Sequence, residues 1–163
     1  MQDSHTTKPV RFRYLKVFIG ISLTFTLNAC VSNKHKGEQT ALEATLICNH
    51  ADRYSGLVVG DGECVSLIKA CSGSGDTEFW RPGKKVLGNL ALTPGSVIAT
   101  FKDGRYPNKS GYHAAIYISH NQQGIWVWDQ WRGKAVHKRL IPNRKGGEPS
   151  NSAQAYRLVK TLK

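Results

Sequence analysis

The alternation of apolar and polar residues after position 95 predicts a series of short β-strands. Five segments have strand composition: 96–101 (SVIATF), 113–119 (HAAIYIS), 125–129 (IWVWD), 135–141 (AVHKRLI) and 155–159 (AYRLV). They are separated by short polar turns such as 121–124 (NQQG), and turns of this length join antiparallel neighbours. The second half of the chain is therefore expected to form an antiparallel sheet.

One helix is predicted before these strands. Residues 63–70 (ECVSLIKA) place their apolar side chains on one side of a helix, and Asp61 or Gly62 precedes them as a cap. The glycine-serine segment 72–75 ends the helix, and a loop containing Trp80 follows. One helix beside an antiparallel sheet is an α+β fold.

The first thirty residues are typical of a targeting segment. Basic residues precede an apolar run at 17–27, which is too short for the roughly 20 residues that a membrane-spanning helix needs. Residues 1–29 are therefore predicted to be a secretory signal peptide. The sequence LNAC at its end resembles the lipobox of bacterial lipoproteins, with Cys30 as the residue that receives lipid. Ordinary cleavage with Cys30 unmodified is the alternative.

Lipid at Cys30, followed by Val31 rather than aspartate, predicts a protein at the periplasmic face of the outer membrane of a Gram-negative cell, held in the membrane by the lipid anchor. Without lipid the protein is expected to be soluble in the periplasm. Residues 30–45 are polar and are predicted to be a flexible tether, and residues 46–163 to form one domain.

The chain is strongly basic. It has 23 Lys+Arg against 11 Asp+Glu, and removal of residues 1–29 leaves 19 against 10. An exported protein meets the cell wall and lipid headgroups as polyanions, so no nucleic-acid partner is expected. A basic surface that only keeps the protein soluble is an equally good interpretation.

Cys64 is the candidate nucleophile. The thiolate is the reactive form of cysteine, and the first turn of a helix favours negative charge. Gly60 and Gly62 are expected to leave the approach to its sulfur open. Cys71 lies two turns later, where the helix dipole opposes a thiolate.

His113 is the candidate base, because it opens a strand directly after the glycine-bearing loop 103–111. His137 lies in a strand with Lys138 and Arg139, which is typical of a solvated face. Asp129, at the end of the next strand, would orient the imidazole, since a carboxylate beside two tryptophans needs a partner. Gln130 is an alternative orienting residue, and Asp129 could instead cap a turn.

The segments GDGECVSLIK, GYHAAIYI and WVWDQW, in this order, resemble the cysteine, histidine and third-residue blocks of the CHAP and NlpC/P60 peptidoglycan amidases. The likeness is strongest to small proteobacterial CHAP-like proteins and to type VI secretion amidase effectors. The resemblance implies a papain-like α+β fold, a helix packed on an antiparallel sheet. It also implies that Cys64 is the nucleophile, His113 the base and Asp129 the orienting residue of a thiol amidase.

By this resemblance the substrate is peptidoglycan, and the bond cut is an amide of the stem peptide such as D-glutamyl-diaminopimelate. Tyr54, Tyr112 and Trp131 are expected to line the substrate groove, whereas Trp80 is better explained as a core residue. Two alternatives stay open: a lipoprotein that binds wall peptides without cutting them, and a thiol acyltransferase with the same triad. An immunity or inhibitor protein is an expected partner if the protein is an effector.

Two cysteines, Cys48 and Cys71, remain after Cys30 and Cys64 have been assigned. Cys48 and Cys71 form a disulfide in an oxidising compartment, or else both are small buried hydrophobic residues. The sequence has no Cys-x-x-Cys and no His-Glu-x-x-His motif, so neither a metal nor another cofactor is expected.

Overall fold

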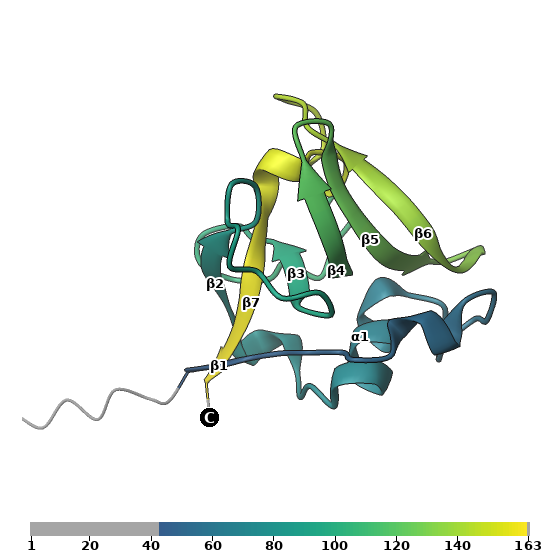
Figure 1. Ribbon diagram of the computed structural model, residues 1–163. Helices are drawn as coiled ribbons and strands as arrows, with labels where there is room; N and C mark the ends of the chain where they lie inside the picture. The colour runs from purple at the N-terminus through teal and green to yellow at the C-terminus, as the bar shows by residue number, and fades with distance from the viewer. Residues whose placement is uncertain (1–42, 163) are drawn as a thin grey trace, which may run out of the picture. The chain divides into compact units, whose positions relative to one another are not determined.

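The computed structural model describes residues 43–162, in which seven strands form one sheet and one α-helix packs against it (Figure 1). The strands are β1 (Glu43–Thr45), β2 (Trp80–Lys85), β3 (Val97–Thr100), β4 (Ala114–Asn121), β5 (Gly124–Trp131), β6 (Lys134–Pro142) and β7 (Tyr156–Leu162). The helix is α1 (Cys64–Ser72), and 3-10 turns lie at Ala51–Tyr54, Thr77–Phe79, Pro149–Asn151 and Ala153–Ala155. The predicted α+β fold is confirmed.

The sheet is built around the last strand. Its order is β1-β7-β3-β4-β5-β6, with β2 paired to β7 as well, and each of these pairs is antiparallel. The short strand β3 joins the two halves, because Ile98 is opposite Leu158 of β7 and Ala115 of β4. All four of its residues are buried, as expected for an interior strand.

Two strands were not predicted, and both pair with β7. β2 contains Pro82 and Gly83, which normally interrupt strands. The absence of a side chain at Gly83 lets β2 approach β7, since a Cβ there would lie 3.0 Å from the carbonyl oxygen of Leu158. β1 lies within the predicted tether 30–45, so the sheet begins three residues before position 46. Backbone pairing needs no apolar pattern, which explains why composition placed the boundary later.

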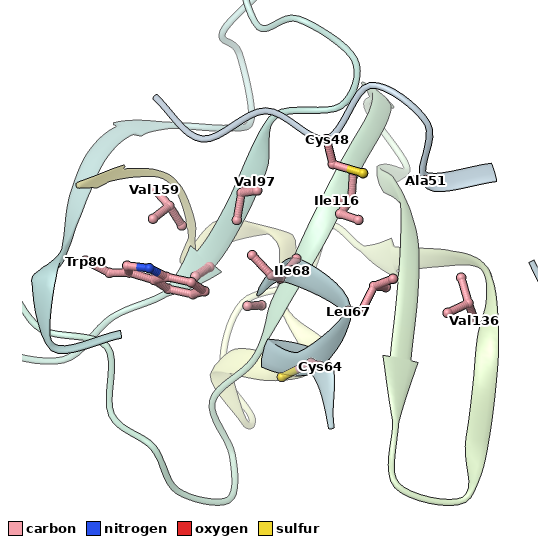
Figure 2. Close-up of a cluster of buried hydrophobic side chains, with 12 residues drawn as sticks. Cys48, Ala51, Cys64, Leu67, Ile68, Trp80, Val97, Ile116, Val136 and Val159 are labelled. Atoms are coloured by element: carbon pink, nitrogen blue, oxygen red, sulfur yellow. The ribbon is translucent and has the colours of Figure 1, made fainter. Parts of the chain in front are cut away.

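A hydrophobic cluster connects α1 to the sheet. Leu67 and Ile68 of the helix are fully buried against the inner side chains of the strands, among them Val97 and Ile116 (Figure 2). Trp80 closes one side of this cluster and is a core residue, as the sequence suggested. Each such large apolar side chain contributes about 2–3 kcal/mol when it is fully buried. The start of α1 is therefore held in a fixed place against β4 and β5.

A disulfide joins Cys48 to Cys71, whose Cα atoms are 5.2 Å apart. It links the segment before α1 to the last turn of that helix. Cys30, the predicted signal peptide and the predicted tether up to residue 42 lie outside the described residues. In the part of the chain that is described, no helix is both long and apolar enough to cross a membrane.

Candidate active site

The turn before α1 places Cys64 at the first position of the helix. Gly60 and Gly62 have φ values of 59° and 83°, a left-handed conformation that favours glycine. At Gly60 a Cβ would also lie 2.8 Å from the Cβ of Ser66. These glycines therefore have a backbone role, because they form the tight turn that leads into the helix. The open approach to the sulfur that was expected of them stays a prediction.

Asp61 stabilises this turn from outside. Its carboxylate accepts hydrogen bonds from the backbone N–H of Glu63 at 3.0 Å and from the Ser66 hydroxyl at 2.6 Å. These bonds lower the pKa of Asp61, the Ser66 hydroxyl contributing most. The residue at the N-cap position is Glu63, rather than Asp61 or Gly62, and its side chain makes no capping bond.

Gln130 anchors the same turn from inside. Its side chain is fully buried; the amide oxygen accepts the N–H of Val59 at 2.7 Å, and the amide nitrogen donates to the carbonyls of Val59 and Glu63 at 2.9 Å each. A buried amide with all these partners fixes the helix start on β5. Gln130 is therefore engaged with the turn and is not placed as the partner of His113.

His113 and Asp129 form a buried pair. Nε2 of His113 lies 2.5 Å from Oδ1 of Asp129, and the aspartate side chain is 0% exposed. The backbone of His113 is held by Thr100, whose hydroxyl oxygen accepts its N–H at 2.9 Å. Because Nε2 is used by the carboxylate, Nδ1 is the ring nitrogen left for the thiol of Cys64.

The electrostatics of the pair favour an imidazolium. Burial alone would lower the pKa of His113, but the hydrogen bonds to Asp129 and Cys64 outweigh it and raise this pKa to about 9. Burial likewise opposes ionisation of Cys64, yet the hydrogen bond and charge of His113 bring the thiol pKa below its ordinary value. The two shifts act in the direction of a thiolate–imidazolium ion pair, because the thiol loses its proton more readily and the imidazole holds its proton up to about pH 9.

Tyr106 lies beside the sulfur and was not identified from the sequence. Its hydroxyl is 3.6 Å from Sγ of Cys64, and its ring packs against Trp80 and Phe101. Burial, followed by the neighbouring thiolate charge, raises the pKa of this tyrosine, so its hydroxyl keeps its proton. The only sequence signal was its place in the loop before His113.

Arg139 was also missed, because its strand was interpreted as a solvated face. Its Nε donates to Oδ2 of Asp129 at 2.5 Å, and its side chain is only 18% exposed. The carboxylate that pairs with His113 thus has a second basic partner.

An open cleft of about 930 Å³ leads to Cys64 and His113. Tyr112 lines it, as predicted for a groove residue. The other two proposed groove aromatics are placed differently. Tyr54 packs against the hydrophobic cluster and its hydroxyl donates to the carbonyl of Ala70 at 3.4 Å. Trp131 presents its ring to His113, His137 and Arg139.

The walls of the cleft carry charges of both signs: Asp61, Glu63, Asp76 and Glu78 with Lys69, Lys109 and Arg132. Among residues 43–162 no group of three or more His, Cys, Asp or Glu side chains is arranged to hold a metal ion. The fold and this cysteine–histidine–aspartate cluster define the class, a papain-like α+β protein.

Comparison with known proteins narrows the class to a family. The model of a family described as domesticated amidase effector 2 matches residues 38–159. A type VI secretion amidase effector 2 protein of Salmonella typhi is 40% identical over 111 residues, covering 60% of this chain and 84% of that protein. The domesticated amidase effector 2 of Ixodes scapularis is 39% identical over 99 residues, covering 58% of this chain and 68% of that protein.

A solved structure of type 6 secretion amidase effector 2 (Tae2) matches with a TM-score of 0.65 and 38% identity, covering 72% of this chain and 94% of that one. The chain belongs to the domesticated amidase effector 2 family. The predicted likeness to type VI secretion amidase effectors is confirmed.

Proposed function

We propose that this protein is an amidase that hydrolyses an amide bond in the stem peptide of peptidoglycan, with Cys64 as nucleophile and His113 as base. The observation that carries the proposal is the buried His113–Asp129 pair, 2.5 Å apart, beside a cysteine at a helix start. The names of the relatives, all amidase effectors, support the same activity.

The reaction begins from the ion pair. The thiolate of Cys64 attacks the amide carbonyl carbon, and a C–S bond forms as the carbonyl becomes an oxyanion. The imidazolium of His113 then gives its proton to the leaving amine while the C–N bond breaks. Neutral His113 next takes a proton from water, which attacks the thioester and releases a carboxylic acid and the sulfur. Asp129 holds the imidazole in place through both steps.

Two donors are available for the oxyanion. The first-turn N–H groups of a helix have no partner within the helix, so the backbone N–H of Cys64 is one donor. The Tyr106 hydroxyl, 3.6 Å from Sγ and protonated because of its raised pKa, is the second. Tyr106→Phe keeps the ring and removes only this donor. The loss of one oxyanion donor costs about 10²–10³-fold in kcat in other hydrolases.

The bond cut is proposed from the family resemblance to be D-glutamyl-diaminopimelate. Digestion of purified sacculi, followed by mass analysis of the fragments, tests this proposal. Fragments that end in D-glutamate with a new diaminopimelate amine support it, and fragments cut at the glycan-to-peptide amide contradict it. The Cys64→Ala protein is the matched control. If the stem-peptide acyl group is transferred to an added amine, and no free carboxylic acid is released, the protein is an acyltransferase.

The site of action is proposed from the sequence. The predicted signal peptide and the lipobox at Cys30 favour a resident envelope enzyme on the periplasmic face of the outer membrane. Growth with a clickable fatty acid should label the wild-type protein and leave Cys30→Ser unlabelled. If the wild-type protein is not labelled, the lipid anchor is contradicted, and the protein is then expected to be soluble in the periplasm. An immunity protein is a partner only if the protein is delivered to other cells.

A further inference from the structure

Each carboxylate oxygen of Asp129 contacts a different basic side chain. Oδ1 is 2.5 Å from Nε2 of His113, and Oδ2 accepts from Nε of Arg139 at 2.5 Å. Asp129 lies on β5 opposite His137 of β6, and Arg139 lies two residues further along β6, opposite Val127. The arginine thus reaches the carboxylate diagonally across the two strands, within the range of cross-strand side-chain pairs.

Arg139 is itself fixed in place. Nη1 donates to the side-chain oxygen of Asn151 and Nη2 to the carbonyl of Ser150, both at 3.4 Å. The guanidinium carbon lies 5.4 Å from the centroid of the Trp131 ring. An arginine held on several sides presents its Nε–H in one direction, which here is toward Asp129.

The charges at the site balance only with this arginine. The reactive form contains two anions, the Cys64 thiolate and the Asp129 carboxylate, and both side chains are buried. His113 supplies one positive charge. Two buried anions that share one cation repel each other, and one of them takes up a proton. Arg139 supplies the second positive charge and brings the sum to zero.

The other ionisable groups near this cluster do not supply that charge. Tyr106 and Tyr156 pack against it from the loop after β3 and from β7, and burial raises the pKa of both, so both are neutral. Glu63, at the start of α1, is an anion paired at 2.9 Å with the exposed Arg132. His137 of β6 packs against Trp131, and its Nδ1 lies 2.9 Å from the carbonyl of Ala135.

We propose that Arg139 is a positioning residue that neutralises and orients Asp129, so that the proton of His113 remains available to Cys64. Arg139 touches no reacting atom and acts through the carboxylate. The inference concerns the ionisation of Cys64, and it can be tested without any peptidoglycan substrate.

The test is the rate of alkylation of Cys64 by iodoacetamide as a function of pH, in the protein carrying Cys30→Ser so that Cys64 is the free thiol. Arg139→Gln is expected to shift the alkylation profile upward by about one pH unit, a tenfold slower reaction on the acid side of the profile. Arg139→Lys keeps the charge and is expected to restore most of the rate. Lys138→Gln, which removes a neighbouring exposed charge on β6, is the matched control and is expected to leave the profile unchanged.

A wild-type profile in a folded Arg139→Gln protein overturns the proposal, and so does an equal shift in Lys138→Gln. Should Arg139→Gln not fold, Asp129→Asn and the double variant Asp129→Asn/Arg139→Gln are compared. In both variants the Cys64 thiolate is then the only anion that competes for the proton of His113. The proposal therefore predicts the same alkylation profile for the single and the double variant, and a further shift in the double variant contradicts it. Because no amide is cleaved in this assay, its result is independent of whether the protein is an amidase.

Discussion

Reduction of the Cys48–Cys71 disulfide should destabilise the domain by an amount that the structure allows us to work out. The two cysteines are 23 positions apart, so the bond closes a loop of about 24 residues. The chain-entropy model gives about 3.4 kcal/mol at 25 °C for a loop of this length. With about 2.1 cal/mol/K of unfolding entropy per residue over residues 43–162, that free energy corresponds to a melting temperature lower by about 10–15 °C.

The assay is thermal unfolding followed by circular dichroism, with and without a phosphine reductant. Cys64→Ala, in the protein that also carries Cys30→Ser, is the background of choice, because the two changes remove both thiols that could exchange with the disulfide. The double variant Cys48→Ala/Cys71→Ala in the same background should have a melting temperature close to that of the reduced protein, and the reductant should not change it. A melting temperature that does not change on reduction of the Cys64→Ala protein would refute the reasoning, as would a reductant effect that survives in the double variant.

Three further predictions concern the site. The rate of amide cleavage should be highest at a pH between the lowered pKa of Cys64 and about 9. It falls on acidification as Cys64 is protonated, and it falls as pH rises through about 9, where His113 loses the proton that the leaving amine needs. A kcat/KM profile that only rises toward an ordinary thiol pKa near 8.5 would contradict the ion pair. His113→Ala should reduce kcat nearly as much as Cys64→Ala does, and Asp129→Ala should reduce kcat less; steady-state kinetics on wall fragments measure both effects. An equal loss of kcat in His113→Ala and Asp129→Ala would contradict a separate orienting role for Asp129. Gln130→Ala removes three hydrogen bonds that hold Val59 and its turn, and it should lower the free energy of unfolding by about 2 kcal/mol or more in urea melts.

The fold was largely predictable because most elements carry a local signal. The five strands from 96 to 159 and the helix at 63–70 appear within a few residues of the predicted ends. β1 and β2 were not predictable in this way. Pro82 and Gly83 are strand breakers in isolation, and β1 is recruited by backbone pairing with β7, a contact more than a hundred residues away in the chain.

The sequence allowed prediction of those site residues whose side-chain chemistry alone marks them as candidates. The structure brings Cys64, His113 and Asp129 together, and their catalytic roles remain a prediction. Tyr106 reaches Cys64 from a segment 42 residues further along the chain. Arg139 reaches Asp129 across the adjacent strands β5 and β6, and it was missed because charged neighbours made β6 resemble a solvated face. Neither the disulfide nor the groove aromatics could be settled from the sequence, since separations between side chains are not encoded in any local pattern.

The most direct test of the central claim is the release of soluble muropeptides from purified sacculi by the wild type and by Cys64→Ala. Cys64 is small, so its replacement should leave the fold intact, which the circular dichroism spectrum of the variant checks. The account predicts release by the wild type and none above the buffer blank by Cys64→Ala. Release by the folded Cys64→Ala protein at a rate near that of the wild type would contradict it.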